Sequence, residues 1–274
     1  MAQGASTLNA RTVRELTLTL PNHTTMVTGR RVDADRGGHG VTWNDERLEP
    51  RTVQGAADHD VASVFSVVDS DRRDPGLFTS KQKLSLFQRS WPSSIDRFEV
   101  RESNPKLVRL TRRDLVEHRR ALTFLHLSLP DSAGHEHGFS SPEYDDAAER
   151  VDRLLGKVIS TIEARPRLRG HTTVIVTADH GGRGKPPGHF DPTEPASFRV
   201  PFVVWGVGVE AGAELYELNE DYRDPGSRRT TYAAQRPPIR NGDAANLTTR
   251  LLGLGRVPGS EFGFGARLHV SSPN

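Results

Sequence analysis

Residues 120–131, RALTFLHLSLPD, form the stretch that decides the fold we expect, an apolar strand that ends at Pro130-Asp131. A helix is predicted next, from about Pro142 to Ala164. Its apolar positions recur on one face: Val151, Leu154, Leu155, Val158, Ile159 and Ile162. Residues 171–179, HTTVIVTAD, then form a β-branched run typical of a central parallel strand buried on both faces. Strand, helix and strand make a βαβ unit, which predicts an α/β fold with a doubly wound, mostly parallel sheet and helices on both faces.

Upstream of this unit, the patterns are shorter. Residues 16–20, LTLTL, alternate strictly and predict a short strand or extended segment before Pro21, followed by a helical turn that closes at Gly29. Apolar residues at helical spacing predict a helix over 58–68, with Asp58 or Asp60 as its N-cap. GLFTSK, residues 76–81, is interpreted as a strand.

The chain is interpreted as a single domain over residues 1–274. Residues 199–209, RVPFVVWGVGV, predict one more strand, and residues 241–254 predict a capped closing helix. Residues 88–113 are rich in arginine and have no clean period, so we expect a variable surface insertion at about 70–115. No internal repeat interrupts this pattern.

Composition excludes several classes of function. The formal net charge is only +2 and the arginines are scattered, so we expect no nucleic-acid binding through a basic patch. The absence of cysteine excludes disulfides, cysteine-ligated zinc and a cysteine nucleophile. No apolar run reaches the length of a membrane span, and the first 30 residues lack a signal-type apolar region. Compartment and oligomeric state stay open.

Two aspartates follow two predicted strands, and each has histidines close behind it. Asp131 precedes His135 in DSAGH, Asp179 precedes His180 in ADHGG, and His189 lies in the next loop. Because ligands bind outside the carboxyl ends of the strands in open α/β sheets, these five side chains are expected to meet. Carboxylates and imidazoles are ligands of zinc and similar divalent ions, so the sequence predicts a metal site.

Other residues near these motifs have more than one interpretation. A single aspartate at a strand end often caps a turn, and a single loop histidine is often solvated. His137 could reach the metal, touch substrate or lie on the surface, whereas Asp191 and Glu194 are candidates to orient His189.

A metal site of this kind would give a catalytic role to a hydroxyl of the threonine-rich stretch TLTLPNHTTMVTGR, residues 17–30. Taken alone it could be an ordinary turn. A threonine hydroxyl bound to a divalent ion has a lowered pKa and can attack phosphorus at neutral pH. Two ions about 3.5–4 Å apart can also clamp the attacking and leaving oxygens of a phosphoryl displacement.

Taken together, the motifs TLPNHTTMVTGR, DSAGH, TADHGG and GHF with RVPFVVWGVGV resemble the alkaline phosphatase superfamily. The resemblance is nearest to the type I phosphodiesterase/nucleotide pyrophosphatase branch. The tail PIRNGDAANLTTRLLGL is similar to the closing segment of sulfatase-like and phosphodiesterase-like members. The resemblance as a whole implies an alkaline-phosphatase-like hydrolase fold.

The resemblance also implies roles for single residues. Thr19 would be the metal-bound nucleophile, with Thr17 or Thr24 as alternatives if the register differs. One divalent ion would be held by Asp131, His135 and His189, and a second by Asp179 and His180, with Thr19 bridging to it. Asn44 would donate to a phosphoryl oxygen or, alternatively, be a plain turn residue. Asn22 and His23 would fix the helix after the nucleophile. Zinc is the first choice of metal, and Mn, Fe or Ca also suit the ligands.

The implied activity is metal-dependent hydrolysis of a small-molecule phosphodiester or pyrophosphate through a Thr-phosphoryl intermediate. The alternatives are an inactive metal-binding domain of the same superfamily and a phosphomonoesterase or sulfatase-like hydrolase. A sulfatase is disfavoured because its matured Cys or Ser is absent and Leu-Pro-Asn stands in that place.

The N-terminal part departs from the family pattern. Members begin with a strand that ends in Asp-Gly, whose Asp binds the second ion, whereas the residues before Thr19 contain no Asp. We therefore expect an N-terminally truncated sheet that lacks the first strand, its Asp and the following helix. Such a sheet would have an unpaired edge or a gap, and its second ion would bind weakly. Family members are often exported, but this chain carries no signal of compartment.

Overall fold

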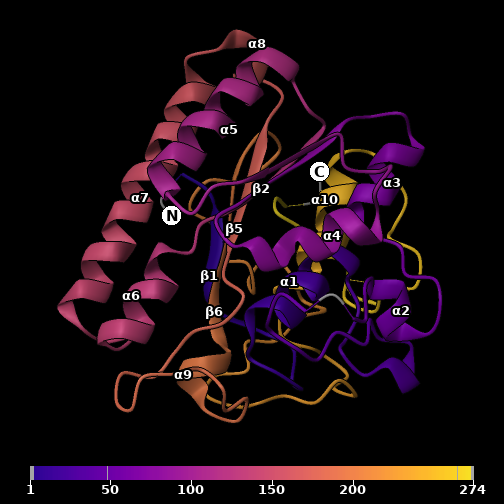
Figure 1. The fold of residues 1–274 in the computed structure, drawn as a ribbon, viewed down its shortest axis with the longest axis vertical. Coiled ribbons are helices and arrows are strands. Elements are labelled where there is room, and N and C mark those ends of the chain that lie inside the picture. Colours follow the sequence, from indigo (N-terminus) through magenta and orange to yellow (C-terminus); the bar gives the residue numbers. More distant parts are fainter. Residues whose placement is uncertain (1–2, 48, 264, 273–274) are drawn as a thin grey trace.

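The computed structural model describes residues 3–47, 49–263 and 265–272. In these ranges strands and helices build an α/β fold (Figure 1). The strands are β1 (Ala5–Arg11), β2 (Pro75–Thr79), β3 (Arg97–Val100), β4 (Leu122–His126), β5 (Thr173–Thr177) and β6 (Arg199–Gly206). The α-helices are α1 (Thr19–Thr28), α2 (Val53–Ala57), α3 (Val64–Ser70), α4 (Ser85–Ser90), α5 (Asn104–His118), α6 (Leu129–His137), α7 (Pro142–Glu163), α8 (Pro166–Arg169), α9 (Pro195–Phe198) and α10 (Asp243–Leu251).

The strands pair in two three-stranded sheets. β2 lies between β3 and β4, and both pairings are parallel. β6 lies between β1 and β5, and both pairings are antiparallel. The predicted parallel pairing therefore holds for the first sheet and not for the second.

The predicted order of strand, helix and strand is present as β4, α7 and β5, but the two strands belong to different sheets. Among the described residues β5 pairs with β6 alone, and its five residues are only half-buried. The expectation of a fully buried central parallel strand at 171–179 was wrong, because β-branched composition reports strand formation and not position in the sheet.

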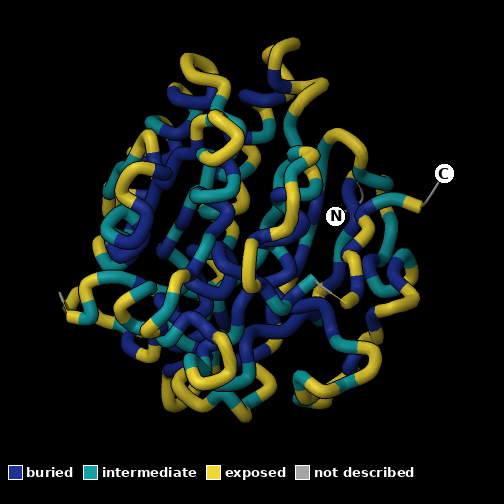
Figure 2. Tube along the Cα trace, turned by 90° about the vertical axis from the view of Figure 1, so that its right-hand side faces the viewer, coloured by how far each residue is buried: buried dark blue, intermediate teal, exposed yellow. Residues whose placement is uncertain are grey.

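Helices cover both faces of the strands, as predicted. Figure 1 shows α5, α6 and α7 on one side and α1, α3, α4 and α10 on the other. The α5 and α7 side packs its apolar residues against one core cluster: Val108, Leu115, Leu154, Val158, Ile162 and Leu168. The opposite side buries a larger cluster in which the rings of Phe65, Phe87 and Trp91 contact one another. Figure 2 shows exposed segments gathered in the outer loops and helix faces.

The expectation that no strand precedes Thr19 was wrong, because the N-terminal segment forms β1, although β1 carries no Asp and the described residues between it and α1 form no helix. β1 precedes Thr19 and pairs along β6, with a register irregularity between Thr7 and Ala10. LTLTL is not a strand, since its last two residues begin α1. α1 ends at Thr28, and Gly29 adopts the left-handed φ of 66° as predicted.

Residues 70–115 contribute a buried strand and a buried helix face to the core, so they are not a surface addition. β2, β3 and most of α5 lie in this range, and every residue of β2 is buried between two neighbouring strands.

The helix expected at 58–68 begins later, at Val64, because Ser63 caps it in a reciprocal bond with Ser66. The strand at 199–209 and the helix at 241–254 are confirmed as β6 and α10. None of the described helices combines the length and apolar character needed to cross a bilayer.

Candidate active site

The threonines of α1 differ in what their hydroxyls contact, and Thr19 is the one beside His180, whereas Thr25 contacts His39. Thr24 and Thr28 donate to the carbonyls of Leu20 and Thr24, at 2.8 and 2.7 Å, as buried helical threonines do. Thr19 is the first residue of α1, and its Oγ1 lies 3.4 Å from His180 Nε2. Thr17 donates to the carbonyl of His189. Of these hydroxyls, that of Thr19 lies next to His180.

α6 carries the first acidic residue of the site. Asp131 lies in its first turn, and not at the end of a strand as expected, because β4 ends at His126 and α6 begins at Leu129. Residues four apart share a helix face, so His135 turns toward the same space. Its Nε2 is 3.5 Å from Asp131 Oδ1, and His189 Nε2 is 3.8 Å from the same oxygen.

Asp131, His135 and His189 fit a divalent ion. One ligand atom from each lies within 4.8 Å of the others, and Asp131 Oδ1 is buried without a hydrogen-bond partner. His189 Nδ1 donates to the Thr17 carbonyl at 2.5 Å, so Nε2 faces the cluster and lies 3.0 Å from His135 Nε2. Burial, and then the charge of His180, lower the pKa of His189 to about 4, so its imidazole is neutral at pH 7, as metal ligation requires.

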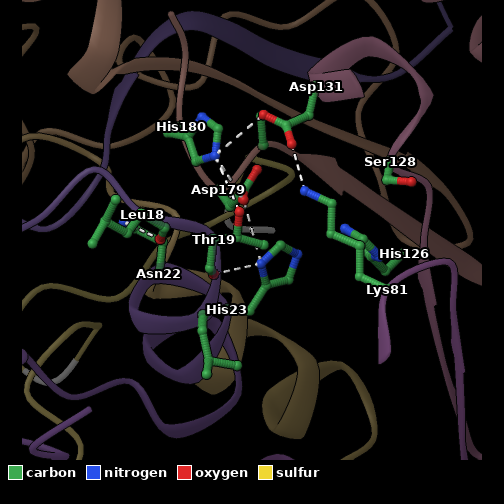
Figure 3. Close-up of polar contacts among 12 residues, drawn as sticks. Leu18, Thr19, Asn22, His23, Lys81, His126, Ser128, Asp131, Asp179 and His180 are labelled. Carbon is green, nitrogen blue, oxygen red and sulfur yellow. Dashed lines mark hydrogen bonds and ion pairs between the residues drawn. The ribbon is translucent and has the colours of Figure 1, made fainter. Parts of the chain in front are cut away.

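The loop after β5 supplies a second pair of an aspartate and a histidine, Asp179 and His180. His180 Nε2 lies 3.2 Å from Asp179 Oδ2 and 3.8 Å from Asp131 Oδ1 (Figure 3). His180 Nδ1 donates to the Gly181 carbonyl at 2.8 Å, which orients the ring. His23 Nδ1 lies 3.5 Å from Asp179 Oδ2 and donates to the Thr19 carbonyl at 2.8 Å. All six residues predicted to bind metal therefore converge.

Electrostatic interactions stabilise the pair of Asp179 and His180. Burial alone would raise the pKa of Asp179, but the charges of His180 and His23 outweigh it and hold that pKa well below its usual range. Burial opposes a charge on His180 as well, yet the carboxylates of Asp179 and Asp131 raise its pKa. The two groups are thus stabilised as an ion pair, and metal binding by His180 would release its proton.

Asn44 lies against the N-terminus of α1. Its Oδ1 accepts from the backbone N–H of Leu20 at 3.0 Å, which fixes the side chain beside Thr19. Its Nδ2 donates to no group in the described part of the chain, so it is available to a ligand. Asn22 is structural, because its amide donates to the carbonyls of Leu16 and Leu18 at 2.7 and 3.1 Å.

Three further residues do not join the cluster. His137 lies near Glu136, with 3.6 Å between Nε2 and Oε2. Asp191 accepts from Thr193 and does not orient His189. Glu194 is the N-cap residue of α9.

Lys81 and His126 were not predicted from the sequence, and Figure 3 shows them in the same site as Asp131 and Asp179. Lys81 follows β2 and forms an ion pair with Asp131 Oδ2. His126, the last residue of β4, is held by Thr79 at 3.0 Å and meets the ring of His23 edge-on at 4.8 Å. Both lie at the carboxyl ends of parallel strands, the one signal that could have found them.

Comparisons with known proteins agree with this geometry. Residues 16–186 match the family model of type I phosphodiesterase / nucleotide pyrophosphatase. GPI ethanolamine phosphate transferase 1 of Mus musculus is 28% identical over 220 residues, which cover 78% of this chain and 22% of the relative. Ectonucleotide pyrophosphatase/phosphodiesterase family member 7 of Homo sapiens is 40% identical over 60 residues, 22% of this chain and 13% of that protein. The chain thus spans about a fifth of the length of the mouse relative.

Solved structures share the fold. Murine ectonucleotide pyrophosphatase / phosphodiesterase 5 superposes with a TM-score of 0.73 at 15% identity, covering 98% of this chain and 92% of that chain. An inactive form of the same protein in complex with AMP gives a TM-score of 0.69 at 15% identity, covering 94% and 89%. These likenesses confirm the α/β architecture, and the resemblance to the alkaline phosphatase superfamily holds. The family model matches more than half of the residues of this chain. The chain therefore belongs to the type I phosphodiesterase / nucleotide pyrophosphatase family.

Proposed function

We propose that this protein is a divalent-metal-dependent phosphoesterase that cleaves a small phosphodiester or pyrophosphate through a phosphoryl group carried on Thr19. The observation that carries the proposal is the position of Thr19 Oγ1, at the start of α1 and 3.4 Å from His180 Nε2. The family membership supports chemistry on phosphate esters, and the AMP held by a structural neighbour supports a small phosphate ligand.

Asp131, His135 and His189 would hold one ion, and Asp179, His180 and Thr19 would hold the other. Such ions, when bound, supply positive charge that polarises the phosphoryl oxygens and lowers the pKa of a bound hydroxyl. We prefer zinc, because imidazole and carboxylate ligands suit it, and Mn, Fe or Ca remain alternatives.

The residues of the chain would do the rest of the chemistry. The N-terminus of α1 presents positive partial charge to an anion, and the free amide of Asn44 donates to a phosphoryl oxygen. As the bond from Thr19 Oγ1 to phosphorus forms, the bond to the leaving oxygen breaks, and the Thr19 hydroxyl proton passes to the leaving oxygen through solvent. Water then attacks the phosphorus, which releases the product and restores the Thr19 hydroxyl.

A second candidate is transfer of the phosphoryl group to an alcohol instead of water. The observation that favours it is the match to a GPI ethanolamine phosphate transferase, which covers 78% of this chain. Both candidates share the Thr19 step and differ only in the acceptor.

The test is hydrolysis of bis-p-nitrophenyl phosphate and a p-nitrophenyl nucleotide ester by zinc-loaded protein, with and without added ethanolamine. Thr19→Ala should lower kcat at least about 1,000-fold, because the attacking atom is lost. Thr28→Ala removes a buried hydroxyl of the same helix far from His180 and should leave kcat within about three-fold. Turnover that persists in Thr19→Ala would overturn the proposal, and a phosphoethanolamine ester as product would favour the transferase.

A further inference from the structure

Lys81 is placed inside the candidate site although no metal-binding role suits an ammonium group. Its Nζ contacts Asp131 Oδ2, and the two side chains are only 21% and 16% exposed. Figure 3 shows Asp131 between His180 and Lys81, with the lysine side chain reaching toward the carboxylate.

The two oxygens of Asp131 have separate neighbours. Oδ1 lies near the Nε2 atoms of three histidines, at 3.5 Å from His135 and 3.8 Å from both His180 and His189. Oδ2 pairs with Lys81. Lys81 therefore leaves the metal-facing oxygen open, and the lysine and an ion can occupy the site together.

The backbone that carries Lys81 is fixed by buried side chains. Thr79 Oγ1 accepts from the Lys81 N–H and donates to the Lys81 carbonyl, both at 3.1 Å. Ser80 Oγ is 2.9 Å from Ser128 Oγ, which anchors the same turn to the segment before α6. The Cα of Lys81 is thus held, whereas its four-carbon stem can still swing the ammonium group.

The surroundings are suited to an anion. Thr19 Oγ1 lies 3.4 Å from His180, which in turn lies 3.8 Å from Asp131, so a phosphorus attacked by Thr19 would be next to the lysine-bound carboxylate. Lys83 follows in a 3-10 helix at Gln82–Leu84 and donates to the Asn44 carbonyl at 2.6 Å, which adds a second cation near the Asn44 amide. A charged donor to a phosphoryl oxygen binds more strongly than a neutral one.

We propose that Lys81 binds the phosphoryl group directly, by exchanging Asp131 Oδ2 for a non-bridging phosphoryl oxygen when substrate enters. The proposal deepens the proposed function and rests on it for the location of the phosphoryl group. It makes Lys81 a substrate-binding residue rather than a support for the metal.

Equilibrium binding of inorganic phosphate to the zinc-loaded full chain tests the proposal without any turnover. Lys81→Met should weaken phosphate binding about ten-fold to a hundred-fold in calorimetry, since one charged hydrogen bond is lost. Lys81→Arg should stay within a few-fold of the wild type. Lys81→Gln provides a second neutral variant in case Lys81→Met folds poorly. Lys157→Met, an exposed position on α7, changes the net charge equally and should have no effect.

Zinc affinity, measured by competition with a chromophoric chelator, separates the explanations. We expect it to be unchanged or tighter in Lys81→Met, because a cation beside a ligand carboxylate is removed. Unchanged phosphate affinity, a parallel loss of zinc and phosphate affinity, or no phosphate binding by the wild type would each overturn the proposal. If phosphate binding responds as expected but no phosphoester is turned over, the proposed function fails while the anion site stands.

Discussion

His135 and His137 lie two residues apart on α6, yet only one of them faces Asp131. His135 Nε2 is 3.5 Å from Asp131 Oδ1, whereas His137 lies beside Glu136. We expect His135→Ala to weaken zinc binding at least about ten-fold, because a ligand is lost, and His137→Ala to leave it unchanged. Chelator competition on the two variants measures both. Equal losses would show that His137 also binds the ion.

His39 makes folding stability depend on pH. Burial lowers its pKa to about 3, while Thr25 and the Val41 N–H hold its two nitrogens. The unfolded chain takes up a proton near pH 6.5 and the folded chain does not, so the stabilisation is complete above that pH and is lost as pH falls toward about 3.

His39→Asn should therefore have a lower free energy of unfolding at about pH 7.5 but a shallower decline between about pH 6 and 4. The wild type should lose up to about 1.4 kcal/mol per pH unit more than the variant. Urea unfolding in the presence of a chelator measures both slopes. Parallel slopes would show that His39 binds its proton in the folded protein.

At the residue scale, the sequence predicted much of the candidate site and missed its cationic part. Short motifs place four of its residues directly after predicted strands, so the sequence could predict them: Asp131, His135, Asp179 and His180. Lys81 could not be predicted, because a lysine after a strand has no spacing that distinguishes it from a solvated surface residue. Its role depends on the approach of α6 to β2, a tertiary contact that local sequence does not encode.

At the scale of elements, α1 depends on the residue that ends it. Gly29 has a φ of 66°, and a Cβ there would lie 2.8 Å from the Ser260 Cβ. Gly29→Ala should lower the free energy of unfolding by at least about 1 kcal/mol, through backbone strain and this clash. The melting temperature should fall accordingly.

Gly156 is the matched control, because it lies in the interior of α7 with no atom within 4 Å of the position that a Cβ would take. Gly156→Ala should raise the free energy of unfolding by about 0.5–1 kcal/mol, since alanine favours a helix. Equal melting temperatures for the two alanine variants would contradict this account of α1.

Elements with a long periodic pattern were the ones that sequence could predict. α7 and α10 have clear apolar faces, and β6 is a long apolar run. β1 has no such pattern, because polar residues such as Ser6 and Asn9 lie in it and its pairing with β6 defines it. LTLTL alternates like a strand, but proline is tolerated in the first turn of a helix, and α1 begins within it.

At the scale of the whole molecule, Asn241 links three distant segments. Its amide donates to Asn22 Oδ1 at 3.2 Å and to the carbonyls of Ala178 and Asp179 at 3.3 Å. Asn241→Ala should cost about 1–3 kcal/mol of unfolding free energy, because buried acceptors lose their donor. Asn241→Asp should cost more, since it also buries a charge. Urea unfolding of both variants provides the measurement, and a more stable Asp variant would contradict it.

The pairing of β1 with β6 joins residues near the start of the chain to residues 199–206. During synthesis β1 therefore leaves the ribosome well before its partner β6. Loop closure over so long a separation is slow, so we expect the N-terminal strand to dock late in folding. Until then the ribosome-bound chain would present an open strand edge, which makes this interval the one in which a chaperone matters most.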